Sequence, residues 1–135
     1  MSSFRHRPTI RFFEADQQQV VYHMWYLAYF EDARNEMLSE GGMSLRSIQE
    51  AGLDLQVVHY DLDWSLPVRW GDDLVIDVDT VAVGTSSFRL TYEASVAGRR
   101  AVSGEAVYVV VAGMGGGARP IPERLRQLLS AGRAA

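Results

Sequence analysis

At 135 residues the chain has the size of one domain that can bury its own core, and its 47% hydrophobic and 22% charged residues are typical of a globular protein. A formal net charge of −4 disfavours nucleic acid as a partner, and the lack of cysteine excludes disulfides and thiolate chemistry. The N-terminus lacks the apolar run of a signal peptide, and no segment approaches the roughly 20 apolar residues of a membrane-spanning helix. We therefore expect a single cytoplasmic domain over residues 1–135.

The first predicted elements are a short strand over residues 9–14 and a long helix over residues 24–40. A polar run at residues 17–19 separates them, and Gly41 with Gly42 ends the helix. Apolar side chains surround much of the helix, which predicts that other structure largely encloses it.

A second, short helix is predicted over residues 44–51, with Ser44 as its N-cap and Gly52 as its stop. Residues 113–117 then read as a flexible glycine linker to a C-terminal helix over residues 122–129.

Between these helices the sequence predicts four strands, over residues 53–66, 72–83, 86–97 and 100–111. The last two connections are short enough for hairpins, so the strands are expected to form an antiparallel meander. Leu74, Ile76, Val78 and Thr80 are predicted to share one face of a strand, and the residues between them the other face. The expected fold is therefore α+β: an antiparallel five-stranded sheet wrapped around a long central helix, the hotdog architecture.

Asp16 is the first candidate for chemistry. It follows the first predicted strand, and the long helix starts about seven residues later. A carboxylate held near the backbone N–H groups of a helix N-terminus lies where a carbonyl can be polarised and an oxyanion stabilised. This arrangement indicates acyl transfer, although Asp16 as an ordinary turn residue is the alternative.

The residues from Asp16 to His23 and from Tyr26 to Leu38 resemble the hydroxybenzoyl-CoA thioesterase group of hotdog proteins, especially its YbgC-like acyl-CoA thioesterases. The resemblance continues through residues 66–72 and 84–86 and covers roughly residues 8–125. It implies hydrolysis of an acyl-CoA or acyl-carrier-protein thioester without cofactor or metal. It also implies homodimers or homotetramers whose active sites lie at the dimer interface.

In this group the aspartate that matches Asp16 is the nucleophile or the general base, and the backbone N–H that matches His23 polarises the carbonyl. The His23 side chain is a candidate for catalysis or for a structural role. On the same resemblance, the predicted substrate-binding residues are Gln19, Tyr22, Met24, Tyr26, Thr85 and Ser86. Three aromatic residues, Tyr22, Trp25 and Tyr26, indicate a core or a dimer interface more often than an aromatic acyl pocket.

Gln18 and Gln19 stand where the family often has glycine. Glycine tolerates left-handed backbone angles that cost other residues about 1 kcal/mol or more, so the turn after Asp16 is expected to differ. Bulkier side chains are also expected to narrow the acyl pocket. Two alternatives to the hydrolase therefore stand: a catalytically silent hotdog protein that binds acyl groups, and a biosynthetic thioesterase that releases a polyketide from a carrier protein.

Other polar residues give weaker signals. His6 and His59 lack metal-ligand spacing, so no metal is predicted. Glu31 and Arg34 are spaced for an ordinary surface ion pair on the long helix, although a second carboxylate near the site is the alternative.

Overall fold

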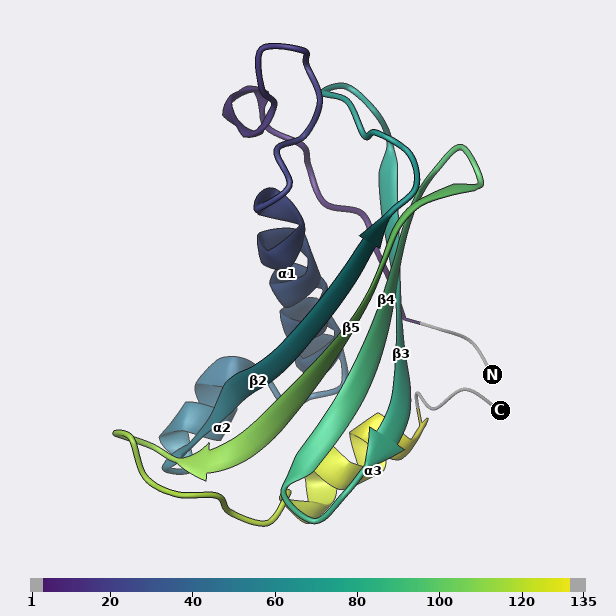
Figure 1. The fold of residues 1–135 in the computed structure, drawn as a ribbon. Helices are drawn as coiled ribbons and strands as arrows, with labels where there is room; N and C mark the ends of the chain where they lie inside the picture. The colour runs from purple at the N-terminus through teal and green to yellow at the C-terminus, as the bar shows by residue number, and fades with distance from the viewer. Residues whose placement is uncertain (1–3, 132–135) are drawn as a thin grey trace.

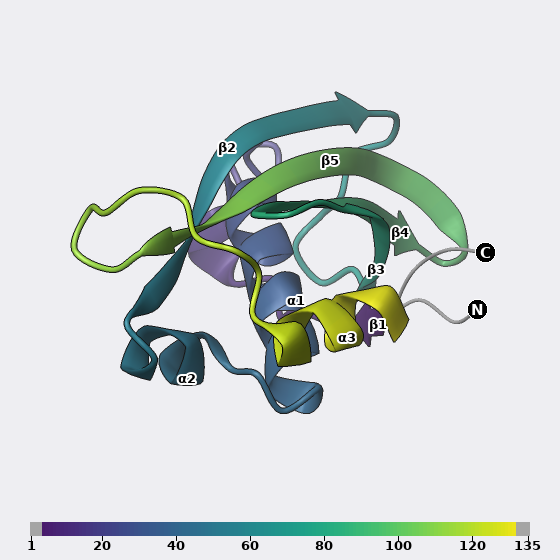
Figure 2. The ribbon, with the colours of Figure 1, turned by 90° about the horizontal axis from the view of Figure 1, so that it is seen from below.

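The computed structural model describes residues 4–131, which form one five-stranded antiparallel sheet and three α-helices. The strands are β1 (Phe4–His6), β2 (Leu53–Trp64), β3 (Leu74–Val83), β4 (Ser87–Val96) and β5 (Arg99–Ala112). The helices are α1 (Trp25–Glu40), α2 (Leu45–Glu50) and α3 (Glu123–Ala131), with a short 3-10 turn, η1, at Phe12–Glu14. The sheet curves around α1, as the view from below shows (Figures 1 and 2). The predicted hotdog fold is confirmed.

The strands lie in the order β1-β3-β4-β5-β2. The two predicted hairpins, β3-β4 and β4-β5, are present. The meander was wrong in one respect, because β2 pairs with β5 instead of β3. Leu66 to Asp73 carry the chain from one edge of the sheet to its other half. As a result β2 is an edge strand, with no strand partner on its far side in the described part of the chain.

The core lies between the sheet and α1. Leu74, Ile76, Val78 and Thr80 of β3 are all buried, as their alternation predicted. Phe30 of α1 is fully buried and stacks on Tyr92 of β4, with ring centroids 4.6 Å apart. Gly104 of β5 permits this contact, since a Cβ at this position would lie 2.9 Å from the Phe30 ring.

The predicted strand over residues 9–14 was wrong. The paired strand lies earlier, at β1, and the end of the predicted segment forms η1. The cause is Glu14, which is 3% exposed and whose carboxylate accepts a hydrogen bond from the backbone N–H of Arg11 at 2.8 Å. This contact closes a turn and leaves Phe12 and Phe13 exposed.

The helices follow the sequence more closely. Ser44 caps α2 by accepting from the backbone N–H of Ser47, as predicted. α1 also has nearly its predicted bounds, but it is enclosed on one side only. Leu27, Ala28, Asp32 and Glu36 face solvent. The loop of residues 113–117 is a turn in which the N–H of Ala112 donates to Gly117.

Candidate active site

Asp16 lies in a tight turn that is held by hydrogen bonds to one of its two carboxylate oxygens. Its Oδ1 accepts hydrogen bonds from the backbone N–H groups of Gln18 at 2.8 Å and Val20 at 3.2 Å. Its backbone N–H donates to the carbonyl of Val20. Asp16 is exposed, and its Oδ2 has no hydrogen-bond partner among residues 4–131. The turn therefore fixes the carboxylate and leaves one oxygen for another molecule.

Gln19 has a left-handed backbone, with φ of 63°. This is the conformation that glycine adopts at no cost, so the glutamine accommodates a turn suited to glycine. Two contacts from the loop before β3 hold the turn: Trp70 donates its N–H to the carbonyl of Gln19, and Arg69 Nη1 donates to the carbonyl of Gln18. The Gln19 side chain is exposed and does not line the cleft beside Asp16.

The N-terminus of α1 lies next along the chain. Val21 donates its N–H to Val68, and Tyr22 donates to Glu14. The backbone N–H groups of His23 and Met24 have no acceptor within the described residues, and no side chain caps the helix. Unpaired N–H groups at a helix start carry partial positive charge and attract a carbonyl oxygen or an oxyanion.

The carboxylate and the helix N-terminus meet at one open cleft with a volume of about 450 Å³. Aromatic rings form its walls: the His23 ring lies 4.2 Å from that of Tyr22, and Tyr26 lies 6.3 Å from Trp64. Burial raises the pKa of Tyr26 to about 12, so its hydroxyl stays neutral at physiological pH. Ten residues line the cleft: Asp16, Val20, Val21, Tyr22, His23, Tyr26, Trp64, Ser65, Leu66 and Pro67.

The cleft thus contains four of the eight predicted site residues: Asp16, Tyr22, His23 and Tyr26. Gln19 and Met24 are close in sequence but do not line it. Thr85 and Ser86 form the β3-β4 turn, where their carbonyls accept from Ile121 and Val110. This turn lies at the opposite end of the sheet (Figure 1), so these two residues do not join Asp16 within one chain.

Two features of the site were missed by the sequence reasoning. Glu14 accepts a 2.8 Å hydrogen bond from the Tyr29 hydroxyl, which ties the segment before Asp16 to α1. Burial, with the bond to Glu14 second, raises the pKa of Tyr29. The second feature is the cleft wall at residues 64–67. The Trp64–Pro67 pattern at a strand end signalled a turn, but nothing local placed it opposite Asp16.

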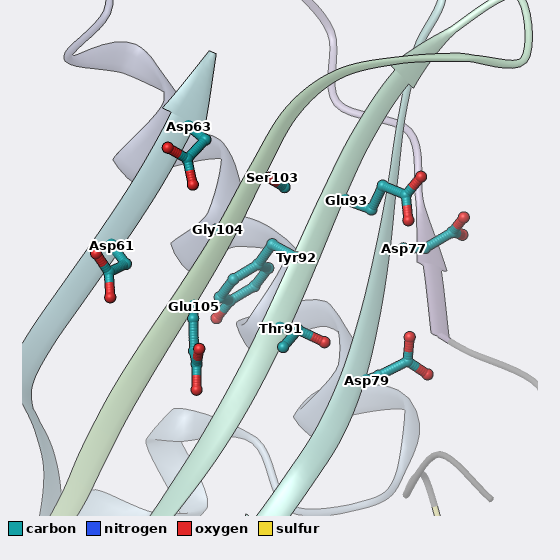
Figure 3. Close-up of a pocket in the computed structure, with 10 residues that line it drawn as sticks. All are labelled: Asp61, Asp63, Asp77, Asp79, Thr91, Tyr92, Glu93, Ser103, Gly104 and Glu105. Atoms are coloured by element: carbon teal, nitrogen blue, oxygen red, sulfur yellow. The ribbon is translucent and has the colours of Figure 1, made fainter. Parts of the chain in front are cut away.

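A second hollow lies on the outer face of the sheet, away from α1 (Figure 3). Carboxylates from β2, β3, β4 and β5 surround it: Asp61, Asp63, Asp77, Asp79, Glu93 and Glu105. Arg5 pairs with Asp77 and Arg89 with Glu105. Within residues 4–131 no group of three or more acidic or histidine side chains has an arrangement that could hold a metal ion.

Comparison with known proteins agrees with this geometry. A family model described as the thioesterase-like superfamily matches residues 10–129. The chain belongs to the thioesterase-like superfamily. Both the resemblance stated from residues 16–38 and the prediction of a thioester hydrolase are thereby confirmed.

Among curated relatives of this thioesterase, a 1,4-dihydroxy-2-naphthoyl-CoA hydrolase of Synechococcus elongatus is 27% identical over 131 residues, which is 96% of each chain. A solved structure from Thermus thermophilus, described as a hypothetical protein, is 25% identical, with a TM-score of 0.89 over 98% of this chain and 100% of that one. A 1,4-dihydroxy-2-naphthoyl-CoA thioesterase from Synechocystis superposes with a TM-score of 0.87 at 23% identity, covering 95% of this chain and 96% of the other. No helix among the described residues is long and apolar enough to cross a membrane.

Proposed function

We propose that this protein hydrolyses an acyl-CoA thioester at the cleft beside Asp16. The observation that carries the proposal is that two residues with an unsatisfied group line this cleft together: Asp16, whose Oδ2 is free, and His23, whose backbone N–H is free. Relatives described as 1,4-dihydroxy-2-naphthoyl-CoA hydrolases support CoA thioesters as the substrate class.

In the proposed reaction the thioester carbonyl oxygen accepts hydrogen bonds from the helix N-terminus, which makes the carbonyl carbon more electrophilic. Asp16 then acts through Oδ2 by one of two routes. It attacks the carbon, expelling the CoA thiolate and forming an anhydride that water hydrolyses, or it takes a proton from a water that attacks. Both routes yield the free acid and CoA. The thiolate is a good leaving group, so neither route needs a strong general acid.

The direct experiment is a panel of acyl-CoA thioesters of differing length and aromaticity, assayed by release of free thiol. The same acyl groups on a carrier protein form a second arm, which separates a CoA thioesterase from one that acts on carrier-bound intermediates. Acyl-CoA binding without thiol release would identify the protein as a silent acyl-binding member. Failure of the whole panel to bind or react would refute the proposal.

The backbone of Gln19 gives a prediction about the turn that holds Asp16. Valine is β-branched and disfavours positive φ, so Gln19→Val is expected to cost about 1–2 kcal/mol of stability and to lower turnover by displacing the carboxylate. Gln19→Gly should preserve the turn and the activity. Gln18→Val is the matched control, because positive φ is recorded at Gln19 and not at its exposed neighbour. Thermal melts and thiol release test this, and equal effects of valine at both positions would contradict it.

We also propose that two copies assemble through the free edge of β2. Val57 and Val58 on this long edge strand are 43% and 55% exposed, and an unpaired apolar edge favours pairing with another strand. Replacing both with lysine is expected to shift a dimer to monomer in sedimentation velocity. Val81→Lys, at an exposed valine of β3, should leave the dimer intact. A wild-type protein that is monomeric at micromolar concentration would rule out assembly at this edge.

A further inference from the structure

Two carboxylates lie on different sides of α1, and their hydrogen bonding differs. On the side toward β2, Glu31 Oε2 accepts hydrogen bonds from the hydroxyls of Tyr60 and Tyr108 at 2.8 and 3.0 Å. Its other oxygen, Oε1, pairs with Arg34 Nη1 at 2.8 Å, so both oxygens of Glu31 have partners. The predicted Glu31–Arg34 pair is therefore present, but it is not a surface pair, because Arg34 is 5% exposed. The second carboxylate, that of Glu14, is not fully paired.

The Glu14 side chain is only 4% exposed, yet one of its oxygens has no hydrogen bond. Oε1 accepts from the Arg11 backbone N–H and from the Tyr29 hydroxyl, both at 2.8 Å. Oε2 accepts no hydrogen bond from residues 4–131. Arg11 Nη1 lies 3.8 Å from it, which exceeds the ~2.7–3.2 Å of an N–H···O hydrogen bond. A ligand whose donor group reaches Oε2 therefore supplies a hydrogen bond that the described part of the chain does not.

Glu14 lines a pocket of about 310 Å³ between the N-terminal segment and α1, a size within the ~300–1,000 Å³ of small-molecule sites. Residues 6–9 and Arg11 line it from the N-terminal segment, and one face of α1 contributes Trp25, Ala28, Tyr29 and Asp32. The pocket shares no lining residue with the cleft beside Asp16. Its strand, β1, is the sheet edge opposite β2. The pocket is therefore separate from the proposed catalytic cleft and from the proposed dimer edge.

Charges of both signs line the pocket. Glu14 and Asp32 are acidic, and Asp32 is exposed, with no hydrogen bond or ion pair to another residue of the described chain. Arg7 and Arg11 are basic. Arg7 pairs with the exposed Asp73 at 3.3 Å, which leaves Arg11 as the cation beside Glu14. The two carboxylates repel a phosphate or another polyanion, and the two guanidinium groups repel a simple amine. The pocket thus favours a small molecule that carries one charge of each sign.

We propose that this pocket binds an α-amino acid with a hydrophobic side chain. Its ammonium group donates to Glu14 Oε2 and lies near Asp32, while its carboxylate accepts from the Arg11 guanidinium. Both charges of an α-amino acid are attached to one carbon, and the charged atoms of Glu14 and Arg11 are 3.8 Å apart, so a single molecule reaches both. Trp25 and Ala28 provide an apolar surface for the side chain, and an indole ring also attracts an ammonium group. This inference goes beyond the proposed thioester hydrolysis and does not depend on it.

Calorimetric titration of the wild-type protein tests the ligand class. The probes are phenylalanine and leucine, then phenethylamine, which lacks the carboxylate, phenylpropanoate, which lacks the ammonium group, and glycine, which lacks the side chain. At least one of the first two is expected to bind with a Kd of about 1 mM or lower, and the other three probes about 10- to 100-fold more weakly. Binding of phenethylamine or phenylpropanoate as tight as that of phenylalanine would overturn the proposal. Absence of binding by both phenylalanine and leucine up to about 10 mM would overturn it as well.

Two acidic variants assign the binding to this pocket. Glu14→Gln keeps an oxygen that accepts from Arg11 and Tyr29 but removes the negative charge, so the Kd of the amino acid is expected to rise about 10-fold or more. Asp32→Asn, at an exposed position that does not endanger the fold, should raise the Kd in the same direction. Glu36→Gln is the matched control, since it removes the same charge from α1 outside the pocket and should leave the Kd unchanged. A wild-type Kd in both acidic variants would place the ligand elsewhere and refute the proposal.

Arg11→Gln provides a second test that does not depend on the stability of Glu14→Gln. The variant keeps the backbone N–H that donates to Glu14 and loses the guanidinium that is proposed to hold the ligand carboxylate. Binding of the amino acid is expected to weaken about 10-fold, while binding of phenethylamine, which has no carboxylate, does not weaken. An arginine that only supports the fold would affect both ligands alike, and that result would overturn the proposal.

Discussion

Asp16→Asn is expected to lower kcat by about 10² to 10⁴ on the best thioester of the panel, the range associated with loss of a positioned base. The asparagine keeps an oxygen that can accept from Gln18 and Val20, so the turn survives. The amide cannot replace the free Oδ2, because it is neither a base nor a useful nucleophile. Thiol release under saturating substrate measures the loss, and circular dichroism with a melting curve measures the fold.

The control for this variant is Asp73→Asn. Asp73 is an exposed carboxylate that pairs with Arg7 outside the cleft, and its loss removes the same charge. Its turnover should match wild type. Near-normal activity in Asp16→Asn would assign the chemistry to another group, and an equal loss in both variants would point to overall charge instead of position.

Phe30→Ala is expected to cost about 3–5 kcal/mol of unfolding free energy, the typical cost of deleting a fully buried aromatic ring. Phe30 is completely buried, stacks on Tyr92 and covers the space left by Gly104. Its removal leaves a cavity at the centre of the contact between α1 and the sheet. We expect a fall in melting temperature of about 10–20 °C.

Phe12→Ala is the matched control for this stability prediction. Phe12 is 73% exposed and touches Trp70 edge to face, so its removal should cost about 1 kcal/mol or less. Chemical denaturation of both variants compares them directly. Similar losses of unfolding free energy in Phe12→Ala and Phe30→Ala would mean that the Phe30 ring does not anchor α1 to the sheet.

The sheet was predictable because its strands repeat a local signal. In β3 Ile76 and Val78 are each followed by an aspartate, and the structure buries Leu74, Ile76 and Val78 on one face. The position of β2 beside β5 was not predictable in this way, because strand order depends on the long connection between β2 and β3. The strand predicted for the segment before Asp16 was wrong for a related reason. Its conformation depends on Glu14 meeting Tyr29, fifteen residues later in the chain.

The candidate site shows the same division. Asp16 and His23 lie in one continuous segment whose spacing is visible in the sequence, and both line the cleft. Thr85 and Ser86 were predicted to bind substrate because of the resemblance. Within one chain they lie at the end of the sheet opposite Asp16. Tyr60 and Tyr108 come from β2 and β5, so their meeting at Glu31 of α1 is a product of strand register. This meeting could not be predicted from sequence spacing alone.

The carboxylates on the outer face of the sheet have a consequence for how substrate arrives. CoA carries several phosphate charges, and the negative potential above Asp61, Asp63 and Glu93 repels it at distances within the Debye length of about 10 Å. Encounters of an anionic thioester with that face are therefore short-lived. The sheet therefore disfavours CoA binding on its outer face in addition to supporting the fold, and this electrostatic repulsion weakens as ionic strength rises.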